Sequence, residues 1–212
     1  MINWELYGRV YPMLEIYVLD LSGTFAFSVY GAFLALKKKL DLFGIFVCAF
    51  LTALGGGTIR EIILNNHPFY FFDYLYLVMI ILGVAFSLFT FFIFHKINKY
   101  MLLLDAVGIV TFAFVGAQKA AEANLGGFAI VFLATVTAVG GGILRDIFIN
   151  EVPQIFYKDL YATPAIILGF FYFLLLEYIS NPFVAYSLLF ITFLIRVYAI
   201  YYKINLWSPL KR

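Results

Sequence analysis

Long runs of apolar residues separated by short polar segments are the dominant pattern of this 212-residue chain. A helix needs about 20 mostly apolar residues to cross the hydrocarbon core of a bilayer. The runs that are long enough cover residues 16–36, 43–64, 74–94, 101–121, 128–149, 160–179 and 182–202. The pattern therefore predicts an all-α integral membrane protein with seven transmembrane helices in a single domain. The boundary between the last two spans depends on Asn181-Pro182 alone.

Composition supports a membrane protein. Hydrophobic residues make up 65% of the chain, charged residues 12%, and the mean hydropathy is +0.99. Soluble domains carry about 25% charged residues, so this chain lacks the polar surface to face water. The N-terminus has an early acidic residue and an early proline, and it does not resemble a cleavable signal peptide. One cysteine, Cys48, excludes an intrachain disulfide, and no basic domain suggests a nucleic-acid partner.

The chain contains the same segment twice. A shift of 85 residues places Gly55–Gly57 on Gly140–Gly142. The same shift relates several polar and turn residues: Asp20 to Asp105, Arg60 to Arg145, Asn65 to Asn150 and Pro68 to Pro153. Repeat one covers about 16–94, repeat two about 101–179, and the seventh helix about 182–202. Because each repeat holds three spans, an odd number, the second copy enters from the opposite side, and the predicted plan is 3+3 inverted repeats plus one helix.

Basic residues predict the orientation in the membrane. The predicted ends that carry lysine or arginine lie on one side, and they hold Lys37, Lys38, Lys39, Lys96, Lys99, Lys158, Lys203, Lys211 and Arg212. Loops rich in these residues stay in the cytoplasm. The N-terminus is therefore predicted outside and the C-terminus in the cytoplasm of a plasma membrane.

Two readings of the glycine runs remain open. A run of three glycines is a point where a helix can bend or open, and such points at matching positions of two inverted repeats are typical of a permeation site. Small residues also let membrane helices approach closely, which would give the runs only a packing role. We expect Gly55, Gly56, Gly57, Gly140, Gly141 and Gly142 to bend their helices and shape a pathway.

The charges inside the predicted spans need partners. Ionisable groups at membrane depth are costly and usually face a partner or water. We expect Asp20 to pair with Arg60 and Asp105 with Arg145, each pair within one leaflet and near a glycine bend, where it would gate one end of a pore. The alternative is that the arginines reach the headgroups. Glu61 and Asp146, the next residues in sequence, are expected to reach the interface.

Other polar residues are candidates to line water. Lys119 has no counterpart in the first repeat, and it either reaches outward to the interface or is a fixed charge that responds to voltage. Thr52, Thr137 and Gln118 are possible pore-lining residues, although a threonine can equally bond to its own helix. His67 and His95 stand on opposite sides, so no metal site is predicted, and no motif of an enzyme is present.

The doubled GGGTIRE and GGGILRD motifs, the 3+3+1 plan and the length resemble prokaryotic members of the trimeric intracellular cation (TRIC) channel family. The resemblance covers nearly the whole chain, from about Tyr17 to Tyr202. The doubled motif belongs to a wider superfamily, which includes bacterial proteins described as glycine transporters. It does not by itself separate a channel from a carrier.

The resemblance implies a homotrimer with one pore inside each protomer, conducting monovalent cations, chiefly potassium with some sodium. It gives both glycine runs a pore-shaping role and makes Lys119 the candidate for a voltage response. It implies no cofactor beyond the permeant ions, with membrane lipids as further partners. The Lys-Glu-Val lipid motif of animal members is replaced here by Arg60-Glu61 and Arg145-Asp146, which argues against phosphoinositide binding. A carrier for a small zwitterion such as glycine, and a membrane protein without transport activity, remain the alternatives.

Overall fold

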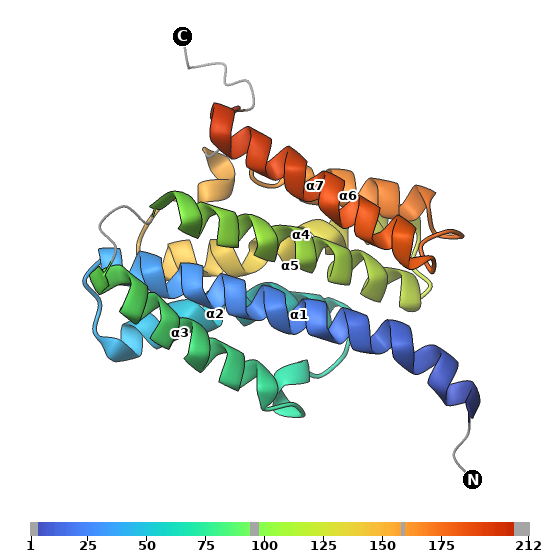
Figure 1. Ribbon diagram of the computed structural model, residues 1–212, viewed down its shortest axis with the longest axis horizontal. Coiled ribbons are helices and arrows are strands. Elements are labelled where there is room, and N and C mark those ends of the chain that lie inside the picture. Colours follow the sequence, from blue (N-terminus) through green and yellow to red (C-terminus); the bar gives the residue numbers. More distant parts are fainter. Residues whose placement is uncertain (1–3, 94–97, 158–159, 206–212) are drawn as a thin grey trace.

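The computed structural model describes residues 4–93, 98–157 and 160–205 (Figure 1). The described residues form a bundle of α-helices. Their bounds are α1 (Trp4–Lys37), α2 (Leu42–Ile63), α3 (Leu75–Ile93), α4 (Asn98–Glu122), α5 (Gly127–Phe148), α6 (Thr163–Leu174) and α7 (Pro182–Tyr202), with short 3₁₀ turns η1 (Phe69–Phe71) and η2 (Gln154–Phe156). Six of these helices are long and apolar enough to cross a membrane. The fold class predicted from the sequence is thereby confirmed.

The predicted spans agree with the helices to within a few residues, with two differences. Helix α1 begins before the predicted span, at Trp4. Helix α6 is only 12 residues long, and the chain continues from Leu175 to Ser180 as turns, so the predicted span at 160–179 is wrong in extent. At 1.5 Å per residue, α6 is too short to cross a bilayer alone. The prediction failed because hydropathy indicates which residues lie in lipid, but it does not indicate where the helical backbone hydrogen bonds end.

Asn181-Pro182 starts the seventh helix, as predicted. The Asn181 side chain accepts a hydrogen bond from the backbone N–H of Phe183, and Pro182 occupies the first turn. Proline fits there because its missing N–H would have no partner in the helix anyway. The turn therefore separates α6 from α7 by local chemistry.

The inverted repeat organises the helix contacts. Between the repeats, α2 packs against α5 and α1 packs against α4 (Figure 1). Within each repeat the first helix contacts the other two: α1 contacts α2 and α3, and α4 contacts α5 and α6. Helix α7 contacts α4 and α6 and so rests on the second repeat. The two copies are thus joined through their equivalent helices, and α7 adds an element to one copy only.

The centre of the bundle is a backbone crossing between α2 and α5. A methyl group placed on Gly56 would overlap the carbonyl oxygen of Thr137, and one placed on Gly141 would overlap that of Thr52. These two contacts are related by the 85-residue repeat, so the pseudo-two-fold axis passes through the crossing. A Cβ on Gly140 would lie 3.2 Å from the Gly56 Cα, so even the glycines meet each other directly. Small residues permit this kind of approach.

The crossing favours the packing reading of the glycine runs. Both α2 and α5 remain α-helical through the glycines, so neither helix opens there. All six glycines are buried. A bend at these positions, and a pathway beside them, stay predictions.

Asparagines end the two central helices in the same way. Asn65 and Asn150 have positive φ angles of 56° and 55°, a left-handed conformation that asparagine tolerates better than most residues. The following backbone N–H groups, of Asn66 and Glu151, each donate 2.8 Å hydrogen bonds to the carbonyls of Glu61 and Asp146. After each turn the chain folds back over the end of the helix, so that η1 covers the charged residues at the end of α2 and η2 covers those at the end of α5.

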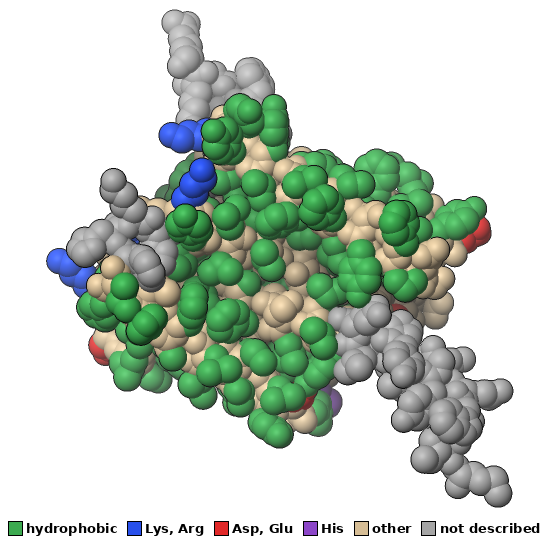
Figure 2. Space-filling view, viewed as in Figure 1, with side chains coloured by type: hydrophobic (Ala, Val, Ile, Leu, Met, Phe, Trp, Pro, Cys, Tyr) green, Lys and Arg blue, Asp and Glu red, His purple; other side chains and the backbone are tan. Residues whose placement is uncertain are grey.

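Charged side chains on the surface gather at the ends of the bundle (Figure 2). We define the basic end as the one that carries Lys37, Lys38, Lys39, Lys99 and Lys203, all of which are exposed. The predicted basic residues Lys96, Lys158, Lys211 and Arg212 lie outside the described residues. Between the ends, the face in Figure 2 shows mainly hydrophobic side chains (green) with uncharged side chains and backbone (tan), as expected for a surface against lipid.

Alanine at the crossing tests its role in stability. Gly56→Ala and Gly141→Ala should each lower the melting temperature in detergent, by a free energy of about 1–3 kcal/mol, because overpacking against a backbone carbonyl outweighs the helix propensity of alanine. Gly126→Ala is the control, since nothing lies within 4 Å of a methyl group at that position. Equal melting temperatures for all three variants would contradict a close backbone crossing.

Candidate functional site

Two clusters of charged residues are buried within the bundle, one in each repeat. The first-repeat cluster holds Asp20, Arg60, Glu61 and Tyr76, and the second-repeat cluster holds Asp105, Arg145, Asp146 and Tyr161. The members correspond one to one under the 85-residue shift. The second-repeat cluster lies towards the basic end, because Asp105 is near the start of α4 and Arg145 is near the end of α5. The first-repeat cluster lies towards the opposite end.

Each arginine pairs with the carboxylate that follows it in sequence. The Arg60 Nε donates to Glu61 Oε1 at 2.8 Å, and the Arg145 Nε donates to Asp146 Oδ1 at 2.9 Å. The two arginine side chains are only 2% and 0% exposed. Neither Glu61 nor Asp146 reaches the interface, so that expectation is wrong.

The predicted ion pairs across helices are therefore replaced by another arrangement. Arg60 binds Glu61 instead of Asp20, and Arg145 binds Asp146. The physical reason is that the flexible arginine side chain folds back over the last turn of its own helix. There the nearest carboxylate is already held in place: Glu61 accepts from the Asn66 side chain, and Asp146 accepts from the Gln154 backbone N–H.

Tyrosines, which the sequence analysis did not single out, bind Asp20 and Asp105. The Tyr76 hydroxyl donates to Asp20 Oδ2 at 2.8 Å, and the Tyr161 hydroxyl donates to Asp105 Oδ1 at 3.0 Å. Both bonds span 56 residues of sequence. The signal was available, since the 85-residue shift places Tyr76 on Tyr161, but tyrosine is too common in this chain to stand out.

The first-repeat cluster is covered by aromatic rings. The Arg60 guanidinium lies 5.4 Å from the centre of the Phe69 ring, and that ring lies 4.5 Å from the ring of Tyr76. A Cβ on Gly57 would come within 2.8 Å of Phe69. Such stacking of a cation on an aromatic face is favourable. The cover on this cluster is therefore apolar.

The second-repeat cluster has a polar cover. Gln154 takes the place of Phe69 under the repeat, and its side chain oxygen accepts from the Tyr30 hydroxyl at 3.2 Å. The Arg145 guanidinium lies 5.1 Å from the centre of the Tyr30 ring. A pocket of about 300 Å³ reaches Asp146 and Gln154 from the basic end. Lys38 and Glu151, which form an ion pair with each other, also line it.

Several buried polar atoms have no hydrogen-bond partner among the described residues. They include Arg60 Nη1, Arg145 Nη1, Asp20 Oδ1 and the Thr137 hydroxyl. A buried polar group without a partner costs about 1–3 kcal/mol, and more when it is charged. Within a membrane, such groups usually mark a route that water or ions occupy. The two arginine atoms are equivalent under the repeat, so buried arginine nitrogens without a partner are a feature that both repeats share.

The remaining predicted site residues lie in three settings. The Thr52 hydroxyl bonds to the carbonyl of Cys48 on its own helix at 2.6 Å, while Thr137 packs against Gly116. Gln118 and Lys119 both bind Glu122 at the end opposite the basic end. Lys119 is thus an interfacial residue in an i,i+3 ion pair, which is the outward-reaching alternative. Its response to voltage stays a prediction.

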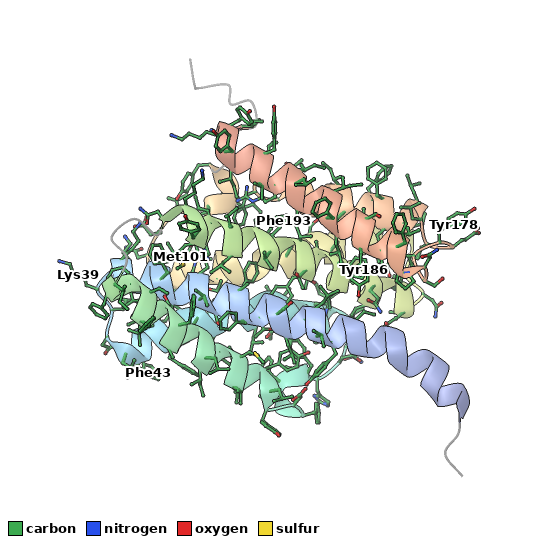
Figure 3. All side chains as sticks on the ribbon, viewed as in Figure 1. Lys39, Phe43, Met101, Tyr178, Tyr186 and Phe193 are labelled. Carbon is green, nitrogen blue, oxygen red and sulfur yellow. The ribbon has the colours of Figure 1, made fainter. Side chains whose placement is uncertain are left out.

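An apolar groove of about 540 Å³ also lies along α7. Tyr186 and Phe193 project from α7 beside α4, as Figure 3 shows, and they line this groove with Val107, Val110 and Leu19. Its walls offer almost no polar atoms, so it is unsuited to ions. Among the described residues, no group of three histidine, cysteine or acidic side chains could hold a metal ion. The two charged clusters are therefore the candidate site.

Double-mutant cycles distinguish the observed pairs from the predicted ones. Arg60→Gln and Glu61→Gln should each destabilise the protein, and the double variant should cost less than their sum by about 1–3 kcal/mol, because direct partners couple. The control cycle of Arg60→Gln with Asp20→Asn should show a smaller coupling. Thermal unfolding of the purified variants measures both. A larger coupling between Arg60 and Asp20 would contradict the arrangement described here.

Comparison with known proteins places this architecture in a family. The sequence model of the glycine transporter family matches residues 17–92 and again residues 102–177, so each match covers three helices. The UPF0126 inner membrane protein YadS of Escherichia coli K12 is 36% identical over 195 residues, which cover 90% of this chain and 94% of that protein. The UPF0126 membrane protein YvgT of Bacillus subtilis is 30% identical, covering 85% of this chain and 89% of that protein.

Solved structures agree with the sequence relatives. A prokaryotic TRIC channel crystallised in 0.5 M KCl has a TM-score of 0.85 and 29% identity, covering 92% of this chain and 100% of that one. A structure described as the basis for conductance through TRIC cation channels has a TM-score of 0.79 and 34% identity, covering 92% and 97%. The TRIC orthologue from Rhodobacter sphaeroides gives 0.73 and 30%, covering 87% and 94%. This multi-pass membrane protein therefore belongs to the TRIC channel family, together with the UPF0126 membrane proteins, and not to a family of enzymes.

Proposed function

We propose that this protein is a potassium-permeable cation channel, with a path inside each protomer of a homotrimer. The observation that carries the proposal is the pair of buried charge clusters at the two ends of the α2–α5 crossing. Ionisable residues within membrane spans commonly mark substrate or ion pathways. The family's solved structures, described as cation channels, point the same way.

The chemistry of the clusters favours cations. The first-repeat cluster has two carboxylates, on Asp20 and Glu61, for one arginine. The Asp20 Oδ1 has no hydrogen-bond partner in the part of the chain that the structure describes, so it can accept a bond from a cation or its water. Carboxylate and hydroxyl oxygens are the ligands that hard cations prefer, and rings of acidic residues select cations in channels. The path would run from one cluster to the other past Thr137, beside the glycine crossing.

The two clusters close the path at its ends. Each tyrosine–aspartate hydrogen bond lies across the route: Tyr76 to Asp20 joins α3 to α1, and Tyr161 to Asp105 joins the start of α6 to α4. An ion passing through would have to displace these hydroxyls or exchange with them. In this proposal the glycines shape the route indirectly, because their close approach fixes where α2 and α5 carry the clusters. Potassium and sodium are the permeant ions, and no cofactor is required.

The basic end is proposed to face the cytoplasm. Lysine-rich loops are retained on that side, and the exposed lysines Lys37, Lys38 and Lys39 lie there at the C-terminal end of α1. This orientation places the N-terminus outside and the C-terminus inside. The Lys119–Glu122 pair would then lie at the outer surface, where a change in membrane potential could act on it.

A carrier for glycine is the second candidate. The description of the matched family model as a glycine transporter favours it. Inverted repeats around a central site are also the architecture of many secondary carriers. A carrier would bind a zwitterion between the clusters, which offer both carboxylates and guanidinium groups.

Recording from purified protein in planar bilayers separates the two candidates. The channel proposal predicts discrete unitary currents in symmetric KCl, with a reversal potential that follows the potassium gradient. Tyr161→Phe should raise the open probability, since it removes one hydrogen bond that holds the second-repeat cluster closed. Saturable glycine uptake without unitary currents would refute the channel and support the carrier.

Thiol labelling tests the orientation. In a Cys48→Ala background, Lys38→Cys at the basic end should react with a membrane-impermeant reagent only from the cytoplasmic side. The matched control is Ala123→Cys, which is exposed at the opposite end and should react only from outside. Reaction of Lys38→Cys from outside would overturn the proposed orientation.

A further inference from the structure

Arg196 is a buried arginine on the one helix that has no counterpart in the repeat. Its side chain is 1% exposed, although it lies within the apolar helix α7. Burying a guanidinium at membrane depth is expensive, so such a residue is expected to have a function and a partner. Neither the repeat nor the doubled motif accounts for it.

Arg196 contacts both members of one tyrosine–aspartate pair. Its Nη2 lies 3.5 Å from Asp105 Oδ2, and its guanidinium lies 4.8 Å from the centre of the Tyr161 ring. Asp105 Oδ1 accepts the Tyr161 hydroxyl at the same time. The arginine therefore holds the carboxylate and the ring that make up this hydrogen bond, from a helix outside the three that form the second repeat.

The equivalent pair in the first repeat has no such cation. Within the described part of the chain, no lysine or arginine lies within ion-pair distance of Asp20, and its Oδ1 has no hydrogen-bond partner. The Tyr76 ring instead packs edge-on against Tyr17, with centroids 6.2 Å apart, and against Phe69. Two pairs that the sequence makes equivalent are thus held by different forces: aromatic contacts at one end and a buried charge at the other.

The charge balance of the clusters differs in the same way. With Arg196 included, the second-repeat cluster has two arginines for its two carboxylates, whereas the first-repeat cluster has one arginine for two. Electrostatic attraction is stronger in a low-dielectric interior than in water. Separating Asp105 from Tyr161 would also break the contact with Arg196, while separating Asp20 from Tyr76 breaks no ion pair.

We propose that Arg196 is a positioning residue that locks the second-repeat cluster through Asp105 and Tyr161, and so makes the basic end of the protomer the more tightly closed of the two. The seventh helix thereby gives sidedness to an inverted repeat that would otherwise have equivalent ends. The consequence for ion current rests on the proposed channel function, but the difference in closure between the two ends does not.

Access of water to the middle of the protomer tests this lock without needing any current. Thr137→Cys in a Cys48→Ala background places a thiol on α5 between the two clusters, and Thr137 is 1% exposed. A membrane-impermeant thiol reagent is applied from each side in turn. The side that the basic end faces is identified by the Lys38→Cys reporter, so the result does not depend on the proposed orientation.

Arg196→Met should raise the labelling rate from the basic end about ten-fold or more, because a buried ion pair is lost. The rate from the opposite end should change by no more than about two-fold, as for a site remote from the substitution. Arg196→Lys retains a charge but loses the planar stacking on Tyr161, so it should give a smaller increase from the same side. The control is Thr192→Val, one turn earlier on the same buried face of α7, whose hydroxyl donates to the Leu188 carbonyl of its own helix. It should leave both rates unchanged.

Equal acceleration from both ends would show general loosening and overturn the lock, and so would unchanged labelling in both arginine variants. If Arg196→Met does not fold, Arg196→Lys is the test: the lock requires faster labelling from the basic end and not from the opposite end. Absence of unitary current together with one-sided acceleration would refute the proposed channel and leave the lock standing. Unitary current in the parent protein, without one-sided acceleration of labelling in the Arg196 variants, would support the proposed channel and refute the lock.

Discussion

The contact between the backbones of α2 and α5 is the constraint on which the rest of the structure depends. Gly56 faces the Thr137 carbonyl and Gly141 faces the Thr52 carbonyl, so the two halves of the protein meet without side chains between them. In lipid there is no hydrophobic force to hold helices together, and close packing of small residues takes its place. This crossing fixes the distance between the halves and therefore the positions of both charge clusters.

The clusters show how an inverted repeat can hold charge at membrane depth. Each arginine is paired with its sequence neighbour, and each central aspartate is bound by a tyrosine, Tyr76 on α3 or Tyr161 just before α6. The halves then diverge in what covers them: Phe69 at one end, and Gln154 with Arg196 at the other. The symmetric core gives two similar ends, and the residues outside that symmetry make the ends different.

Sequence patterns predicted the fold well because its determinants are local and periodic. Apolar runs, the Asn181-Pro182 helix start and the 85-residue repeat each have a direct physical meaning. The partners of Arg60 and Asp20 were not predicted correctly, because side-chain contacts depend on where η1 folds back over the helix ends. Arg196 could not be singled out for a related reason: its contacts come from segments far apart in the chain, and it has no counterpart in the repeat. The 85-residue shift does relate Tyr76 to Tyr161, but tyrosine is too common in this chain for that match to stand out.

The most direct test of the central claim is the number of independent ion paths in the proposed homotrimer. Trimers are assembled with one Thr137→Cys protomer and two protomers that lack a reactive thiol, and a charged thiol reagent is added during bilayer recording. A path inside each protomer predicts that modification removes about one third of the trimer's potassium current and leaves the rest unchanged, because the protomers of a symmetric oligomer are equivalent. Loss of the whole current, or no loss, after complete modification of that single thiol would contradict the account.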